Sequence, residues 1–145
     1  MIHLACTPAD FVAQDASGVR WLDRVADYAL ARELWVALGH ALSEQDWGEA
    51  HDLGYTYAAL VEAGKIASIA AVWRYSEPAW EVAAVSTRPE YRRRGYSTRV
   101  VAFVTTHILQ HGRLATCTTR DDNAAMLATA RRVGFRVVLS EKAGE

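Results

Sequence analysis

The stretch RPEYRRRGYS, residues 88–97, combines residue types that suit the binding of an anion. Five of the 16 Lys and Arg residues fall within residues 88–99, which carry a net charge of +4, whereas the whole chain carries −1. Guanidinium groups bind phosphate with bidentate geometry. Gly95 allows a positive φ and lets the backbone approach a ligand closely. The stretch therefore predicts a local site for an anion.

Two expected elements position this loop. Residues 80–87 are typical of a strand, and residues 97–110 predict a helix despite their many β-branched side chains, because fourteen residues are long for a strand. A helix start presents unpaired N–H groups and the positive end of the helix dipole. We therefore predict a phosphate or pyrophosphate at this helix start. The alternatives are a solvated arginine face and an ordinary strand–helix connection, since neither GxxxxGK[ST] nor GxGxxG is present.

The other elements predict a mixed α/β sheet. The EAGK turn joins two strands into a hairpin, and strands alternate with helices in the second half, which favours parallel crossovers there. Further strands are expected at residues 2–6, 55–62, 65–75, 114–119 and 135–140, and further helices at residues 21–38, 43–51 and 123–133.

Length and composition bound the class of protein. The 145 residues fit one domain, residues 1–145, and 51% hydrophobic with 23% charged residues is typical of a soluble globular protein. The N-terminus lacks the features of a signal peptide, and the apolar run IASIAAVW is too short to span a membrane. Cys6 and Cys117 form no CxxC pair, which argues against a disulfide framework or a metal site. We expect a cytoplasmic protein that uses no metal and binds no membrane.

Two segments resemble the GNAT superfamily of acyl-CoA-dependent N-acyltransferases. Residues 92–97, RRRGYS, are similar to the family's Arg/Gln-x-x-Gly-x-Gly/Ala signature, with Ser97 in place of the usual Gly or Ala. Residues 123–135, NAAMLATARRVGF, resemble the second motif, in which an Asn opens a helix that ends in Gly-Phe. The resemblance covers residues 80–140. It implies a twisted, mostly antiparallel mixed sheet flanked by helices, with a short C-terminal end.

The resemblance also implies how acetyl-CoA binds. Backbone groups of Val85 and Thr87 would hold the pantetheine arm, and N–H groups along residues 93–98 would hold the pyrophosphate. Asn123 would contact the lower part of the cofactor, or act only as a helix N-cap. Arg88, Arg92 and Arg94 would reach the 3′-phosphate or simply raise the local potential. The predicted cofactor-binding residues are Val85, Thr87, Arg92, Arg93, Arg94, Gly95, Tyr96, Ser97, Thr98 and Asn123.

Glu81 is the candidate general base, because many GNAT-like sequences carry a Glu on this strand; the alternative is an ordinary solvated side chain. Strand alternation predicts that Glu81, Ala83, Val85 and Thr87 face the same side. His51 and Glu49 are weaker candidates for the acceptor pocket, and Cys117 is expected to be a small buried residue.

The family's usual general acid is a Tyr four residues before the Gly of Gly-Phe. Ala130 occupies that position here, with Thr129 beside it. This departure puts acid catalysis of thiolate departure in doubt, although a CoA thiol is acidic enough to leave unassisted.

The predicted function is transfer of an acetyl group from acetyl-CoA to a primary amine of a small molecule or peptide by direct attack. The alternative is a catalytically weak acyl-CoA-binding sensor or interaction domain. A nucleic-acid binder is the least favoured hypothesis, because the rest of the chain is acidic. The short C-terminus leaves a sheet edge that is open, covered by the N-terminal segment, or paired in a homodimer.

Overall fold

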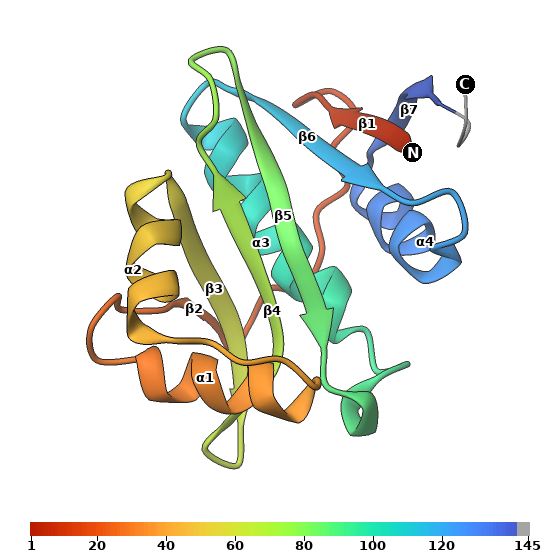
Figure 1. The fold of residues 1–145 in the computed structure, drawn as a ribbon. Helices are drawn as coiled ribbons and strands as arrows, with labels where there is room; N and C mark the ends of the chain where they lie inside the picture. Colours follow the sequence, from red (N-terminus) through yellow and green to blue (C-terminus); the bar gives the residue numbers. More distant parts are fainter. Residues whose placement is uncertain (142–145) are drawn as a thin grey trace.

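The computed structural model describes residues 1–141; residues 142–145, the end of the predicted domain, lie outside this part. Figure 1 shows a twisted sheet with helices on both faces. In chain order the elements are β1 (Ile2–Cys6), β2 (Val19–Trp21), α1 (Tyr28–Ala37), α2 (Glu44–Asp52), β3 (Tyr55–Glu62), β4 (Lys65–Trp73), β5 (Ala79–Thr87), a 3-10 turn (Pro89–Tyr91), α3 (Tyr96–Gln110), β6 (Leu114–Thr119), α4 (Ala124–Val133) and β7 (Arg136–Ser140).

The sheet is mixed and mostly antiparallel, which confirms the predicted fold class. Its strand order is β2-β3-β4-β5-β6-β1-β7, and β5 and β6 are parallel neighbours. All the other neighbouring pairs are antiparallel. Helix α3 connects β5 to β6 and covers one face, whereas α1 and α2 cover the opposite face over β2, β3 and β4 (Figure 1). Within residues 1–141, no helix combines the length and the apolar character needed to cross a bilayer.

Two hydrophobic clusters lie on the two faces of the sheet. Val100, Val104 and Ile108 belong to the cluster on the α3 side and recur at helical spacing, which confirms that this β-branched segment is a helix. Leu34 and Trp47 belong to the cluster under α1 and α2. Strand β4 is buried on both faces, because it lies between these clusters.

The expected helix over residues 21–38 is wrong at its first seven residues. Trp21 belongs to β2, where it pairs with Ala58, and its indole packs edge-on against Phe103 at 5.1 Å. Val25 is 84% exposed, although the helical pattern had placed it on the apolar face. Tertiary packing of the large indole therefore outweighs a local helical period that Trp21 and Val25 share by chance.

The N-terminal strand covers the sheet edge for which the sequence left three alternatives. Strand β1 lies between β6 and β7, with Leu4 opposite Cys117 on one side and opposite Val137 on the other. Of the three alternatives left open by the sequence, the N-terminal segment therefore covers β6. The new edge is β7, whose five residues are all exposed.

The glycine of the Gly-Phe motif has a packing role. Gly134 ends α4 with φ +111°, and a Cβ atom there would lie 2.2 Å from the carbonyl oxygen of Asp10. Only glycine allows this close approach, because any side chain would displace the turn that follows β1.

Candidate active site

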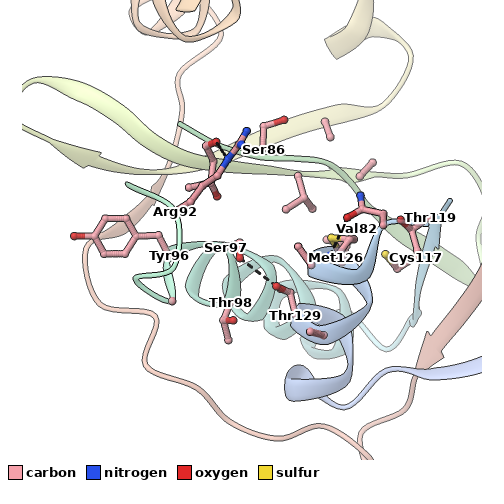
Figure 2. Close-up of a pocket in the computed structure, with 18 of the residues that line it drawn as sticks. Val82, Ser86, Arg92, Tyr96, Ser97, Thr98, Cys117, Thr119, Met126 and Thr129 are labelled. Atoms are coloured by element: carbon pink, nitrogen blue, oxygen red, sulfur yellow. Dashed lines mark hydrogen bonds between the residues drawn. The ribbon is translucent and has the colours of Figure 1, made fainter. Parts of the chain in front are cut away.

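A cleft opens where β5 and β6 diverge. The two strands pair only over three residues, with Ala79, Trp80 and Glu81 opposite Leu114, Ala115 and Thr116. Beyond them lies a cleft of about 1080 Å³, lined by residues 82–87 of β5, the arginine loop, residues 117–119 of β6 and one side of α4 (Figure 2). Since β5 has no ladder partner on this side past Glu81, its backbone edge faces the cleft.

A β-bulge interrupts β5 inside the cleft. Ala84 and Val85 together lie opposite Ala70 of β4, and Ala84 has φ +54°. A bulge bends its strand and increases the local twist. We attribute the divergence of β5 from β6 in part to this bulge, which the sequence pattern did not indicate.

The bulge reverses the alternation of side chains along β5. Ala83 pairs with Ala71 on the face covered by α1 and α2, whereas Thr87 pairs with Ser68 and its hydroxyl lies 2.8 Å from the Ser68 hydroxyl. Val85 packs against the cluster on the α3 side. The expectation that Glu81, Ala83, Val85 and Thr87 share a face is therefore wrong, because one inserted residue shifts the two-residue period.

The loop before α3 presents backbone N–H groups in an arrangement that suits an anion. Arg93 and Gly95 have φ +64° and +77°, and a Cβ atom on Gly95 would meet nothing within 4 Å. In the described chain, the N–H groups of residues 93–98 donate to no acceptor. The Thr98 hydroxyl is buried and also has no partner there. The first N–H groups of a helix have no intrahelical acceptor, and the buried Thr98 hydroxyl adds a donor without a partner, so this helix start presents hydrogen-bond donors that suit an anion.

Arg88 does not belong to this arrangement. Its side chain is 5% exposed, and its Nη1 donates to Glu33 of α1 over 3.2 Å while its Nε donates to the Ile66 carbonyl over 3.1 Å. The expectation that Arg88 reaches a phosphate is therefore wrong. The first arginine of the stretch instead attaches the loop to α1 and β4.

The remaining arginines lie at the mouth of the cleft. Arg92 and Arg93 line it, and Nε of Arg92 donates to the Thr87 carbonyl over 3.3 Å (Figure 2). Arg94 does not line the cleft; its guanidinium lies 5.2 Å from the centre of the Tyr91 ring. Of the three arginines expected to reach the 3′-phosphate, only Arg92 lines the cleft; Arg88 is buried against α1 and β4, and Arg94 packs on an aromatic ring.

Tyr96 and Ser97 connect the start of α3 to its surroundings. The Tyr96 hydroxyl donates to the Glu62 carboxylate, which raises the pKa of Tyr96. The Ser97 hydroxyl lies 3.2 Å from that of Thr129 on α4 (Figure 2). This contact joins α3 to α4 along one wall of the cleft.

Helix α4 supplies the opposite end of the cleft. Asn123 lines it, and its Oδ1 accepts the N–H of Met126 over 3.1 Å, as the helix N-cap interpretation expected. Ala130 is fully buried in the core on the α3 side and does not line the cleft, whereas Thr129 does. The side chain at the family's Tyr position therefore does not reach the cleft in this protein.

Glu81 does not line the cleft itself. It lies where β5 and β6 part, next to Val82 and hydrogen-bonded to Thr118, and both of these residues line the cleft. Oε1 of Glu81 accepts a hydrogen bond of 3.0 Å from the Thr118 hydroxyl. Burial, and secondarily the charge of Glu81, raise the pKa of Cys117 to about 12. Cys117 is thus a buried thiol, which confirms the expected structural role. Two titratable side chains flank the Thr118 hydroxyl, the Glu81 carboxylate at 3.0 Å and Nδ1 of His3 at 3.4 Å.

The two weaker acceptor-pocket candidates lie away from the cleft. His51 packs between Trp47 and Tyr57, and Glu49 is an exposed residue of α2 that accepts from Gln45. Neither lines the cleft. Sequence reasoning instead missed Leu38 and His40, Thr119, and Met126 with Arg132, which do line it. Thr119 lies close to the second motif, and Met126 and Arg132 lie within it, so the motifs could have indicated these three residues. Nothing in the sequence marked Leu38 and His40, which follow α1.

The structure is thus a mixed α/β sheet in which two parallel strands diverge beside the start of a helix. The sequence profile of the acetyltransferase (GNAT) family matches residues 18–135, so this chain belongs to that family. Membership supports acyltransferase activity in general. A search of curated proteins found no significant match.

Solved structures share the fold. A GNAT-family acetyltransferase from Novosphingobium aromaticivorans has a TM-score of 0.76 and 22% identity, covering 94% of this chain and 58% of its own. The ribosomal-protein-S18-alanine N-acetyltransferase of Escherichia coli has a TM-score of 0.66 and 19% identity, covering 80% and 75%. An aminoglycoside N-acetyltransferase in complex with CoA has a TM-score of 0.64 and 17% identity, covering 86% and 98%. The chain spans only 58% of the Novosphingobium protein.

Proposed function

We propose that this protein is an N-acetyltransferase, folded as one domain over residues 1–145, that transfers an acetyl group from acetyl-CoA to a primary amine by direct attack. The observation that supports this most is the set of unpaired N–H groups at residues 93–98, together with the unpartnered Thr98 hydroxyl. These residues, apart from Arg94, line a cleft whose walls also include Val82 and Thr118, and the carboxylate of Glu81 lies beside these two residues where the strands part.

The residues of the cleft fit the parts of a CoA molecule. The N–H groups of residues 93–98 would hold the pyrophosphate, with Arg92 and Arg93 adding positive charge. Backbone groups of Val85 and Thr87, on the edge of β5 without a ladder partner, would pair with the amide-containing pantetheine arm. Asn123 would contact the cofactor through its amide nitrogen, since its oxygen already caps α4.

Acetyl-CoA supplies a thioester whose C–S bond breaks as the amine nitrogen bonds to the acetyl carbon. The protein's part is to accept a proton and to stabilise charge. Glu81 would take the proton from the ammonium group, a role worth roughly 10²–10⁴ in rate. A backbone N–H near the bulge at Val85 would stabilise the carbonyl oxygen, typically worth about 10²–10³. Ala130 offers no acid, so the thiolate would leave without protonation by that position.

A second candidate is an acyl-CoA-binding sensor, and the buried Ala130 at the usual Tyr position is the observation that favours it. Titration calorimetry with acetyl-CoA, CoA and dephospho-CoA tests the cofactor site that both candidates share. We expect micromolar binding, weaker without the 3′-phosphate because Arg92 and Arg93 line the cleft. Thiol release from acetyl-CoA that accelerates on adding an amine would identify the enzyme. Binding without such release by any amine would favour the sensor, and no binding would exclude both.

A further inference from the structure

Four residues from four neighbouring strands form one row across the sheet. Tyr55 of β3 pairs with Trp73 of β4, Trp73 pairs with Glu81 of β5, and Glu81 pairs with Thr116 of β6. Directly paired residues project from the same face of a sheet. Glu81 therefore lies between an indole on one side and a threonine on the other, on the face away from α3.

Aromatic rings lie next to Glu81 in this row and beyond it. The rings of Tyr55 and Trp73 are stacked at 5.3 Å with an interplanar angle of 7°, and Tyr75 lies 5.2 Å from Trp73. The Tyr75 hydroxyl is 3.1 Å from the Thr116 hydroxyl on β6. Because β5 lies between β4 and β6, the Tyr75 side chain reaches across the sheet beside Glu81. Tyr75 is 43% exposed, so this corner is open to solvent.

Glu81 lacks a cationic partner in residues 1–141. Within this part of the chain, the Glu81 side chain accepts a hydrogen bond from the Thr118 hydroxyl and forms no ion pair. Arg74, which directly follows β4, points to the opposite face, where it contacts Thr56 and His107. The negative charge of Glu81 near Tyr55 is also one cause, after burial, of the raised pKa of Tyr55.

The carboxylate and the aromatic rings together suit one kind of ligand. A carboxylate without a cation attracts an ammonium group, and aromatic rings beside it add cation–π attraction and a flat apolar surface. An acceptor that carries a carboxylate next to its amine would be repelled by Glu81. The row of paired residues contains no Lys or Arg that would offset this repulsion.

We propose that Tyr55, Trp73, Tyr75 and Glu81, here called the aromatic corner, bind the acceptor, and that the acceptor is a primary ammonium on an aromatic skeleton without a neighbouring carboxylate. This inference rests on the proposed function, because Glu81 connects the aromatic corner to the cofactor cleft. Trp73 and Tyr75 are specificity-determining residues that contact the skeleton, and Glu81 contacts the ammonium group.

Matched pairs of amines test the acceptor class. Calorimetry on the CoA-saturated full chain measures binding without turnover, using tryptamine against tryptophan and tyramine against tyrosine, with spermidine as a non-aromatic cation. We expect each decarboxylated amine to bind at least about tenfold more tightly than its amino acid, and more tightly than spermidine. In acetylation assays the same order should hold for kcat/KM.

Two variants test the residues. Trp73→Leu should weaken tryptamine binding about tenfold and raise KM while leaving acetyl-CoA affinity unchanged. Tyr75→Ala, at an exposed position that tolerates truncation, should weaken it several-fold, whereas Tyr75→Phe keeps the ring and should retain most of the affinity. Unchanged tryptamine binding in both Trp73→Leu and Tyr75→Ala would overturn the inference.

The outcomes separate this inference from the proposed function. If acetyl-CoA binds and the protein acetylates spermidine or tryptophan as well as tryptamine, the function stands and the acceptor class is wrong. If acetyl-CoA does not bind, the proposed function fails, and the inference fails with it.

Discussion

The Thr118 hydroxyl donates to Oε1 of Glu81 over 3.0 Å, across the point where β5 and β6 stop pairing. This contact orients Oε1, whereas the other carboxylate oxygen has no hydrogen-bond partner among residues 1–141. A carboxylate held in this way beside the cleft is suited to take a proton from an amine.

Glu81→Gln tests the base directly. Glutamine keeps the shape and can still accept from Thr118, but it cannot take a proton. We expect kcat at neutral pH to fall by at least about tenfold, within the range known for general bases. Calorimetry should show unchanged affinity for acetyl-CoA, since Glu81 does not line the part of the cleft assigned to the cofactor.

Glu77→Gln is the matched control. Glu77 precedes β5, is 93% exposed and pairs with Arg113 on the surface, so neutralising it should leave kcat unchanged. A Glu81→Gln enzyme that turns over at the wild-type rate would show that another group, or bulk water, accepts the proton.

Gly95→Val tests the anion-binding loop. Gly95 has φ +77°, and the space where a Cβ would project is open, so a valine would both strain the loop and occupy the approach to the helix start. We expect acetyl-CoA affinity to fall beyond detection by calorimetry. Gly112→Val is the control, because Gly112 has φ +71° and an equally open Cβ position in the α3–β6 turn. Equal losses of affinity in both variants would point to general strain instead of a local site.

Substitution of Arg88 should lower stability, whereas substitution of Arg92 should weaken acetyl-CoA binding. Arg88→Met leaves Glu33 and the Ile66 carbonyl without their partner, which should lower the free energy of unfolding by about 2 kcal/mol and leave acetyl-CoA affinity unchanged in the folded protein. Arg92→Met should weaken acetyl-CoA binding and leave stability unchanged. Urea denaturation and calorimetry measure the two effects. Weaker cofactor binding by folded Arg88→Met would contradict its assignment as a structural arginine.

His107 predicts how stability depends on pH. Burial, with the nearby charges of His111 and Arg74, lowers the pKa of His107 from 6.5 to about 4. The unfolded state therefore binds this proton more readily than the folded state does. The folded state has its full stability above pH 6.5 and loses stability relative to the unfolded state as the pH falls from 6.5 towards 4. Denaturation curves should show the free energy of unfolding falling over that window. His107→Gln should flatten the slope and the exposed His40→Gln should not; an unchanged slope in His107→Gln would contradict the prediction.

Local sequence patterns predicted most of the elements because their causes are local. Strands at residues 55–62 and 114–119 follow from β-branched and aromatic residues between turn signals, and their bounds agree with β3 and β6. The helix expected over residues 97–110 agrees with α3 to within one residue, since α3 begins at Tyr96 after the N-cap Gly95. The family motifs then indicated the order of the elements and the region of the cleft.

The failures share one physical cause, which is contact between residues far apart in the chain. Trp21 joins a strand instead of a helix because β3 and Phe103 bind it there. Arg88 turns away from the cleft because Glu33, 55 residues earlier, pairs with it. A carboxylate partner at that distance leaves no trace in local periodicity or charge density.

The sequence by itself determined the family, the fold class and the position of the arginine loop between a strand and a helix, since these depend on short motifs and on the alternation of element types. Only the tertiary structure decided the faces of β5, because the bulge at Ala84 depends on pairing with β4. It likewise decided that β1 covers β6 and that Glu81 lies beside Trp73. Strand pairing joins distant residues, so the side chains that surround the candidate base become visible only once the sheet is assembled.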